Sequence, residues 1–228
     1  MKQKLVVLSG AGISAESGIS TFRDANGLWE NHRIEEVASP EGFEANPELV
    51  MRFYNLRRAQ LKEVVPNEAH KLLVQLEEKY DVQIITQNVD DLHERAGSSN
   101  VLHLHGELNK VCPIDNTVFG TTWEGDLHIG DTDERGVQLR PYIVWFGEAV
   151  PNIELATFWV ENADILLVIG TSLQVYPAAG LLHYAPKNCK IYHINPDETP
   201  LVNSKHIFIQ NVASKGMKTF CEMIENKK

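Results

Sequence analysis

Short apolar runs that alternate with amphipathic helical stretches constrain the fold of this chain more than any other feature. Strands that read as continuous apolar runs between helices are typical of a parallel sheet covered on both faces. The alternation therefore predicts an α/β fold. The expected strands are Lys4 to Leu8, Val82 to Thr86, Ile165 to Gly170, Lys190 to Ile194 and His206 to Ile209.

Helical periodicity fills most of the chain between these runs. Asn46 is placed as an N-cap, Pro47 fits the first helical position, and Pro66 fits a stop. The expected helices are Pro47 to Val64, Asn67 to Lys79, Ile153 to Asn162 and Ser214 to Glu225. The stretch 109–140 is rich in Asp, Gly and Thr and keeps neither period, so we interpret it as an inserted module.

The predicted organisation is one domain over residues 1–228. Its large part would comprise about 1–24, 64–108 and 141–228. A small lobe would be formed by two insertions, at about 25–63 and 109–140.

A polar motif follows each of the five runs. SGAGIS follows the first, TQNVDD the second, GTSLQVYPAAG the third, NPD the fourth and QNVASKG the fifth. The carboxyl ends of parallel strands share one edge of the sheet, and ligands of open parallel sheets bind there. Five polar motifs at one edge predict a binding site.

The glycine-rich segment Gly10-Ala11-Gly12 indicates what that site binds. Glycines between a strand and a helix, here expected at Ile13 to Ser17, let the backbone approach a diphosphate. With Ala15 in the third place the pattern is G-x-G-x-x-A. A dinucleotide-dependent dehydrogenase would place a second strand and an acidic residue about 20 positions later. The polar segment GISTFRDANGLW stands there instead, which disfavours a dehydrogenase. A tight turn without a ligand is the alternative.

Composition excludes several classes of function. The formal net charge of −10 argues against sequence-independent nucleic-acid binding, which needs clustered Lys and Arg. No run of about 18 apolar residues is present, so we expect no membrane partner. Cys112, Cys189 and Cys221 lie far apart and form no disulfide framework, which favours a reducing cytoplasm.

Longer motifs resemble a known family. GAGISAESGISTFRDANGLW, TQNVDDLHERAG, HLHGEL, VWFGE, GTSLQVYPAAG and INP occur in the order and approximate spacing of the sirtuins, the NAD-dependent protein deacylases. The resemblance extends from Gly10 to about Ala213. It implies a Rossmann-type domain and a small lobe, with NAD and acyl-lysine proteins, bound as extended peptides, meeting in the cleft between them. The implied products are nicotinamide, O-acyl-ADP-ribose and free lysine.

The resemblance also implies roles for particular residues. His105 would be the base, and a histidine near its ordinary pKa can accept a proton at neutral pH. Asn88 and Asp90 would complete the catalytic group, whereas His93 and His103 are expected to be structural. The residues expected to bind NAD are Gly10, Ala11, Gly12, Ser14, Ala15, Phe22, Arg23, Asp24, Trp29, Gln87, Asn88, Val89, Asp90, Gly170, Thr171, Ser172, Asn195, Pro196, Asp197 and Ala213.

The substrate peptide has a candidate edge in VWFGE. Val144, Trp145, Phe146 and Gly147 resemble the segment that pairs with an extended peptide through main-chain hydrogen bonds. A buried aromatic strand end is the alternative, and both can hold together.

The predicted helix from Pro47 to Val64 carries the clue to the acyl group. At 100° per residue its apolar residues, Leu56 among them, form one arc, with Arg57 near the middle, Tyr54 at the edge and Arg58 directed to solvent. An inward arginine needs an anion, because an unpaired buried charge is costly; an internal salt bridge is the alternative. Tyr54-x-x-Arg57 resembles the pair of the sirtuin branch that prefers acidic acyl groups, which predicts desuccinylation and demalonylation with deacetylation retained.

The sequence departs from the family at its zinc module. Most sirtuins hold zinc with two cysteine pairs, but this stretch contains only Cys112, and a structural zinc site needs four ligands. We therefore expect no metal and a lobe packed around Val118, Phe119 and Trp123. An irregular site of Cys112 with His128, Asp115 or Asp131 is the alternative. An ADP-ribosyltransferase and a non-catalytic NAD-binding module remain rival functions, and monomer is the default state.

Overall fold

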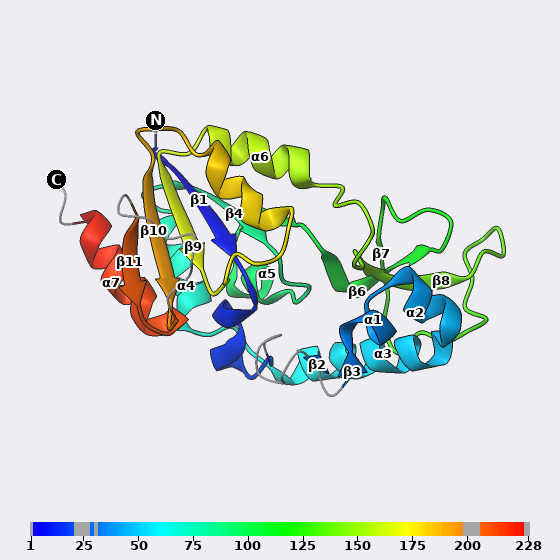
Figure 1. Cartoon of the computed structure of the whole chain (residues 1–228). Coiled ribbons are helices and arrows are strands. Elements are labelled where there is room, and N and C mark those ends of the chain that lie inside the picture. The colour runs from blue at the N-terminus through cyan, green and yellow to red at the C-terminus, as the bar shows by residue number, and fades with distance from the viewer. Residues whose placement is uncertain (1, 21–27, 30–31, 198–205, 226–228) are drawn as a thin grey trace.

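A six-stranded parallel sheet forms the centre of the large part of the molecule. The computed structural model describes residues 2–20, 28–29, 32–197 and 206–225. The strand order is β11-β10-β9-β1-β4-β5 (Figure 1). The strands are β1 (Lys4–Ser9), β4 (Asp81–Thr86), β5 (Val101–His103), β9 (Ile165–Ile169), β10 (Lys190–Asn195) and β11 (Ile207–Gln210). The predicted fold class is confirmed, and all five predicted runs are strands. The short β5 was not predicted as a strand.

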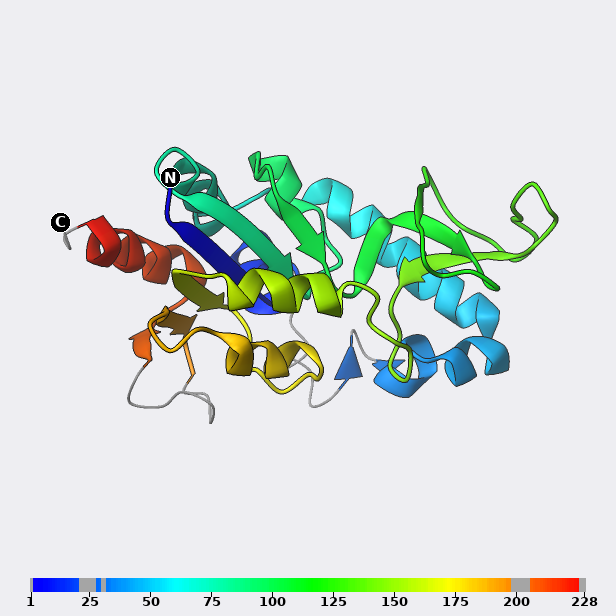
Figure 2. The same ribbon diagram turned by 90° about the horizontal axis from the view of Figure 1, so that it is seen from above.

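Helices cover both faces of this sheet, as the apolar runs predict (Figure 2). Leu5 and Val7 of β1 point to a core shared with α4 (Glu68–Leu76) and α7 (Ala213–Glu225). Val6 and Leu8 point to the other face, where α6 (Ile153–Glu161) and the 3-10 helix η3 (Ala178–Tyr184) pack. Successive side chains of a strand alternate between faces, so one apolar run serves two cores.

The order in which the chain adds strands creates a crevice. From β1 it continues to β4 and β5 on one side and then crosses to β9 on the other side of β1. The first long helix against the sheet after β1, α4, covers one face, whereas η3, which follows β9, covers the other. In open α/β sheets such a switch point is where ligands bind.

The rest of the described chain forms a smaller part beside the sheet. It contains α1 (Ile34–Val37), α2 (Pro40–Ala45), α3 (Pro47–Glu63) and the ladder of β2 (Leu28–Trp29) with β3 (His32–Arg33). A three-stranded sheet, β7-β6-β8, covers α3 and consists of β6 (Gly106–Pro113), β7 (Thr121–Thr122) and β8 (Leu139–Ile143). This sheet extends beyond both ends of the predicted insertion 109–140, and we keep the division into a large part and a small lobe as a proposal.

Two local predictions were wrong. The helix expected at Ile13 to Ser17 is replaced by the 3-10 turns η1 (Ala11–Ile13) and η2 (Ala15–Ser17). The chain reverses at Gly18, whose φ of 97° ends the second turn before an α-helix can form. In the small lobe, Val118 and Phe119 are 54% and 78% exposed and do not form a core.

Part of the core of the small lobe lies between α3 and the three-stranded sheet. Met51 packs there with Val111, Leu127 and Leu139, and Trp123 packs against the edge of this group. A sheet of so few strands must bury its apolar face against a helix, and α3 provides that surface. Val118 and Phe119, in the β6–β7 connection, are not members of this group.

The interpretation of α3 needs a further correction. Leu56, placed on the inward arc, is 56% exposed, whereas Arg58, placed in solvent, is only 4% exposed. The Arg58 guanidinium donates to the Leu108 and Gly125 carbonyls and to Asn55 Oδ1. β6 and the inserted module cover this side of the helix and supply main-chain acceptors, which a helical-wheel argument cannot include. The short helix α5 (Leu92–Ala96) contacts α4.

Buried neutral histidines predict acid lability. Burial lowers the pKa of His70 to about 4, against an opposing effect of Glu94, and lowers that of His193 to about 4 as well. The unfolded chain therefore binds more protons than the folded chain from about pH 6.5 down to pH 4, and stability is lost as pH falls through that window. Between pH 6.5 and 5 we expect a loss of roughly 2 kcal/mol per ring.

Urea unfolding at several pH values measures this loss. His70→Gln should flatten the dependence, because one titrating ring is gone. A free energy of unfolding that stays constant from pH 6.5 to 5 would refute the prediction.

No helix among the described residues is long and apolar enough to cross a membrane.

Candidate active site

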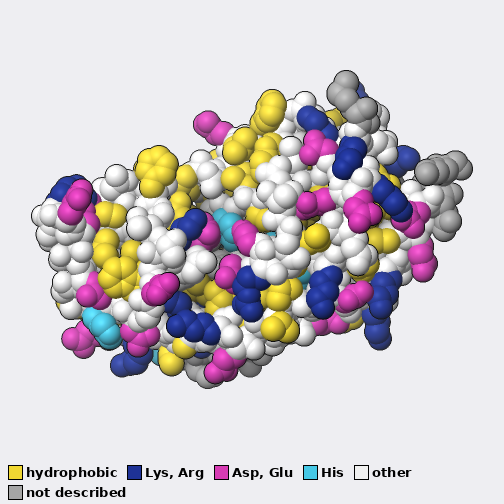
Figure 3. Space-filling model, turned by 180° about the vertical axis from the view of Figure 1, so that it is seen from behind, with side chains coloured by type: hydrophobic (Ala, Val, Ile, Leu, Met, Phe, Trp, Pro, Cys, Tyr) yellow, Lys and Arg dark blue, Asp and Glu magenta, His cyan; other side chains and the backbone are white. Residues whose placement is uncertain are grey.

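A cavity of about 660 Å³ opens at the carboxyl edge of the sheet and extends between its loops and the small lobe. Loops after β1, β4, β9 and β10 form one wall, and α3, β6 and the segment after β8 contribute the other. In Figure 3 histidine and carboxylate side chains are visible in the recess near the middle of the molecule. The edge predicted from the polar motifs is therefore the location of the cavity.

The glycine-rich loops after β1 and β9 touch through their main chains. Gly10 N–H donates to Ile169 O at 3.0 Å, and Gly12 N–H donates to Gly170 O at 2.8 Å. A Cβ on Gly12 would lie 2.8 Å from the Gly170 Cα, and one on Gly170 would lie 2.2 Å from Ile13 N. Both loops line the cavity. Because these loops lack side chains at the glycines, a diphosphate can approach their main chain closely. The loops therefore fit the dinucleotide predicted to bind here.

The loop after β4 carries a buried polar group. Asn88 Nδ2 donates to Ser14 Oγ at 3.1 Å, and Ser14 Oγ donates to Asp90 Oδ2 at 3.0 Å. Burial raises the pKa of Asp90, while the Leu92 N–H and the Ser14 hydroxyl stabilise its charged form. Asn88 and Asp90 line the cavity, whereas Ser14 is buried behind them. Ser14 therefore aligns the two side chains without forming part of the wall.

His105 lies between β5 and β6 and lines the same cavity. Its Nδ1 is 3.0 Å from the Gln87 carbonyl, and a carbonyl only accepts, so Nδ1 carries the proton. Burial lowers the pKa of His105, and the bond to Gln87 opposes this effect. The ring is thus neutral at pH 7, with the lone pair on Nε2. Gly106, at φ 85°, leaves no room for a Cβ, which would lie 2.1 Å from the Tyr142 carbonyl.

The far end of the cavity is formed by the loops after β9 and β10. Thr171 Oγ1 accepts from Gln87 Nε2 at 3.1 Å, which ties the loop after β9 to the loop after β4. The Asn195 Nδ2 is buried and has no hydrogen-bond partner among the described residues. A buried amide without a partner is costly, and a ligand with hydroxyl groups would satisfy it. This group supports the fit of a dinucleotide at this end.

The small lobe brings an arginine and an aromatic segment to the cavity. Arg57 lines the wall and stacks on Phe53, with the Cζ 5.1 Å from the ring centroid. Trp145 is buried and its indole Nε1 donates to the Tyr54 hydroxyl at 3.1 Å, whereas Phe146 is 48% exposed at the cavity. The VWFGE segment therefore includes a buried aromatic side chain, as the alternative predicts, and it also lines the cavity. Its pairing with an extended peptide stays a prediction.

Most predicted site residues meet at the cavity. Tyr54 and Ser14 are described but do not line it, and Tyr54 is fully buried. Phe22, Arg23 and Asp24 lie outside the described residues, as does the side chain of Trp29. The predicted residues that line it are Gly10, Ala11, Gly12, Ala15, Arg57, Gln87, Asn88, Val89, Asp90, His105, Val144, Trp145, Phe146, Gly147, Gly170, Thr171, Ser172, Asn195, Pro196, Asp197 and Ala213.

Other lining residues were not predicted. Four of them lie within the motifs VWFGE and GTSLQVYPAAG and could have been predicted from these motifs: Glu148, Val175, Tyr176 and Pro177. The rest come mainly from apolar positions whose role depends on how the small lobe packs: Glu16, Ile19, Ser20, Ile34, Ala38, Gln60, Leu61, Leu108, Ile143, Val150, Ile194 and Val212.

The acidic and thiol groups of the small lobe form no ligand set. Among the described residues no group of three or more His, Cys, Asp and Glu side chains could hold a metal ion. Asp115 pairs with Arg135, and Asp131 Oδ2 accepts from the His128 main-chain N–H. Burial raises the pKa of the Cys112 thiol to about 11, which disfavours the thiolate that zinc binds. The structure does not support the irregular site, and the absence of zinc stays a prediction.

Comparison with known proteins places the chain in a family. The model of the Sir2 family matches residues 10–177. The NAD-dependent protein deacylase of Bacteroides thetaiotaomicron is 53% identical over 97% of this chain and 98% of its own length. The NAD-dependent protein deacylase of Helicobacter pylori strain 26695 is 61% identical over 85% of each chain.

Solved structures agree in fold. A Sir2 homologue in complex with NAD has a TM-score of 0.88 and 40% identity, covering 99% of this chain and 90% of its own. A Sir2 protein bound to acetylated peptide has a TM-score of 0.81 and 29% identity, covering 98% of this chain and 94% of its own. The motifs, the switch-point cavity and these matches agree: the chain belongs to the Sir2 family, the sirtuins.

Proposed function

We propose that this chain is an NAD-dependent protein lysine deacylase that converts NAD, acyl-lysine and one water to nicotinamide, O-acyl-ADP-ribose and free lysine. The observation that carries the proposal is the state of His105 at the cavity: the protonated Nδ1 is held by the Gln87 carbonyl, and burial keeps the ring neutral. A neutral ring with Nε2 available is a general base at pH 7. The similarity to curated deacylases over nearly the whole chain supports the same reaction.

Residues at different positions along the cavity would have different roles. The glycine loops would hold the NAD diphosphate, and Asn88 with Asp90 would hold the nicotinamide end. NAD supplies the ribose carbon from which nicotinamide departs. The His105 Nε2 would remove a proton from a ribose hydroxyl.

An acyl-lysine protein would bind as an extended peptide along Val144 to Gly147. Val144 N–H donates to the His105 carbonyl, which fixes this segment beside the base. We further propose a cytoplasmic monomer without bound zinc and without a nucleic-acid partner. The net charge of −10 argues against a nucleic-acid partner. The three free cysteines are typical of a reducing cytoplasm. Metal analysis and light scattering of the purified protein test these points.

The direct experiment incubates the protein with NAD and one peptide carrying acetyl-, malonyl- or succinyl-lysine, followed by mass spectrometry. Loss of the acyl group together with an equal amount of O-acyl-ADP-ribose is the expected result. Transfer of ADP-ribose to protein would instead indicate a transferase. NAD binding without any product would indicate a non-catalytic module, and either result would refute the proposal.

Arg57 is proposed to select acidic acyl groups. It lines the cavity and its guanidinium can bind a terminal carboxylate with two parallel hydrogen bonds. The structure does not place Tyr54 beside it at the cavity wall, because the Tyr54 hydroxyl is buried and accepts from Trp145. Selection by this site therefore depends mainly on Arg57.

Arg57→Met should lower kcat/KM for desuccinylation by about 30-fold or more, because a buried carboxylate would lose its partner. Deacetylation should change by less than a factor of about 3, since an acetyl group carries no charge for Arg57 to bind. Arg52→Met is the matched control, because Arg52 is an exposed arginine on the same helix. Equal losses for succinyl and acetyl substrates would contradict the assignment of Arg57 to the acyl group.

A further inference from the structure

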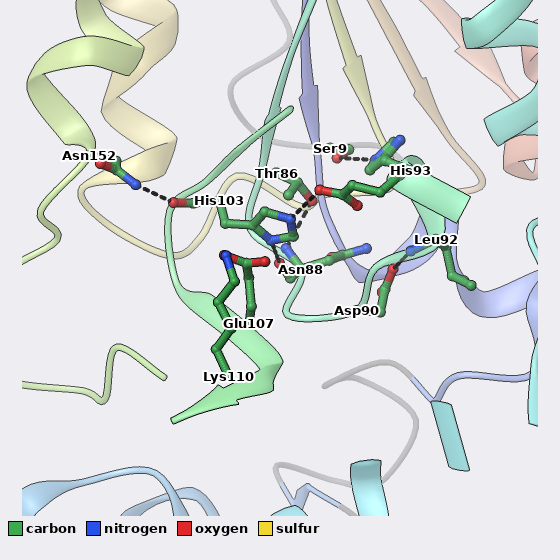
Figure 4. Close-up of polar contacts among 11 residues, drawn as sticks. Ser9, Thr86, Asn88, Asp90, Leu92, His93, His103, Glu107, Lys110 and Asn152 are labelled. Carbon is green, nitrogen blue, oxygen red and sulfur yellow. Dashed lines mark hydrogen bonds and ion pairs between the residues drawn. The ribbon is translucent and has the colours of Figure 1, made fainter. Parts of the chain in front are cut away.

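His103 stands two residues before His105, and its environment differs from that of the base. It ends β5, is 9% exposed, and pairs in register with Thr86 of β4. Its main-chain carbonyl accepts from Asn152 Nδ2 at 2.8 Å, so the backbone is fixed from both sides. Figure 4 shows its ring between the loop that carries Asn88 and the strand that carries Glu107 and Lys110.

Both ring nitrogens of His103 face hydrogen-bond acceptors. Nδ1 lies 3.0 Å from the Asn88 carbonyl, and Nε2 lies 2.8 Å from Glu94 Oε1 of α5. A carbonyl and an ionised carboxylate accept only, so a ring that satisfies both carries two protons. The only other arrangement puts the proton on Glu94 and leaves the ring neutral.

The charges around the pair favour the doubly protonated ring. Burial opposes charge on His103, but the hydrogen bond and charge of Glu94, with the charge of Glu107, outweigh it and raise its pKa. Burial would also raise the pKa of Glu94, yet the bond to His103 lowers it. The two directions agree that the proton is on the histidine. His93 of α5 is buried and neutral, and Lys110 already pairs with Glu107 at 2.7 Å.

The contacts of this ring lead directly to the cavity. Three consecutive carbonyls of the loop after β4 are each held by one donor from the segment 103–108. Gln87 O accepts from His105, Asn88 O accepts from His103, and Val89 O accepts from the Leu108 N–H. The positive ring of His103 also favours the ionised form of Asp90.

We propose that His103 is a positioning residue for deacylation: as an imidazolium paired with Glu94, it fixes the Asn88 main chain and favours the ionised form of Asp90. The inference rests on the proposed function. It assigns opposite charge states to the two histidines of HLHG, a cation that orients the loop and a neutral base that receives the proton. Asn88 and Asp90, whose side chains Ser14 links, belong to the loop that this arrangement holds.

Two variants separate the charge of the pair from its hydrogen bonds. Glu94→Gln keeps an oxygen acceptor for Nε2 and removes the charge that holds the second proton. His103→Asn keeps an amide N–H for the Asn88 carbonyl and removes the imidazolium. Glu107→Gln is the matched control, because Glu107 raises the pKa of His103 by its charge without contacting the ring.

NMR of protein with 15N-labelled histidine rings reads the charge without any need for activity. The His103 signal is identified as the ring signal that disappears in His103→Asn. It should show two protonated nitrogens at pH 7, and its titration midpoint should lie above the ordinary histidine pKa of about 6.5. In Glu94→Gln its titration midpoint should fall, and in Glu107→Gln it should fall less. A singly protonated His103 at pH 7, or a midpoint that ignores Glu94→Gln, would overturn the proposal.

The pH profile of kcat/KM then links that charge to catalysis. Wild type should lose activity on the alkaline side as His103 deprotonates, and Glu94→Gln should move this limb to lower pH. His103→Ala should lower kcat/KM for NAD by about 10-fold, and His103→Asn should recover part of the loss. An alkaline limb that stays in place in Glu94→Gln would assign the pair a purely structural role. If wild type removes no acyl group, the proposed function fails, while the NMR result still decides the charge of His103.

Discussion

His105→Ala is expected to lower kcat/KM for deacylation by about 10²- to 10⁴-fold, the range that a positioned general base contributes. The fold should persist, because among the described residues the ring makes one hydrogen bond, to the Gln87 carbonyl, and the β5–β6 backbone is held independently by the Val144 N–H. Steady-state kinetics with NAD and an acyl-lysine peptide give the loss, and thermal unfolding shows whether the fold is intact.

The pH dependence distinguishes a base from a residue that only shapes the cavity. Because burial lowers the pKa of His105, the neutral ring persists below pH 6.5, and the acid limb of kcat/KM should lie below that value. His128→Ala is a suitable control, since His128 is exposed on the small lobe. A fall in activity of less than tenfold in His105→Ala would remove the ring from the catalytic step.

Gly170→Ala is expected to damage both stability and NAD binding. Gly170 has φ of 64°, and a Cβ there would lie 2.2 Å from Ile13 N and 2.9 Å from the Gly12 Cα. These contacts are with backbone, so no side chain can rotate away. We expect a loss of about 3 kcal/mol or more, from the left-handed conformation together with the displaced loop, and a fall in Tm of roughly 10 °C.

A matched glycine separates the two causes. Gly130 also has a positive φ, of 100°, but a Cβ there would meet nothing within 4 Å. Gly130→Ala should therefore cost only the conformational strain of about 1 kcal/mol, and NAD affinity should not change. Calorimetry with NAD measures the affinity of each variant. If Gly170→Ala and Gly130→Ala lower Tm by the same amount, the close contact between the two glycine loops is not the cause of the lost stability.

The sequence predicted the sheet because its strands are buried on both faces. A run such as Leu5 to Leu8 contributes alternate side chains to two cores, so every position is apolar and the run is visible without an alignment. The three residues of β5 are too few for that signal, and its ends depend on pairing with β4. The edge where polar motifs meet followed from the same strands, since parallel strands end at one edge.

The sequence pattern did not predict which side chains of the small lobe are buried or which groups they contact. A helical wheel treats one side of α3 as core and the other as solvent, but β6 and the inserted module cover a second side and bury Arg58 with main-chain acceptors. Tyr54 likewise has the predicted sequence spacing from Arg57, but Trp145 holds its hydroxyl away from the cavity wall. Contacts between segments about 50 to 90 residues apart decide both outcomes.

The sequence by itself determined the family, the parallel sheet, the edge that carries the site and most residues of the cavity, because local motifs and strand periodicity encode them. Only the tertiary structure distinguishes the surroundings of the two histidines of HLHG, on which the proposed difference in charge rests. Their sequence context is nearly the same, yet His103 faces a carbonyl and the Glu94 carboxylate, whereas His105 faces one carbonyl and the cavity. The proton count of an imidazole depends on the acceptors around it, and these come from distant parts of the chain.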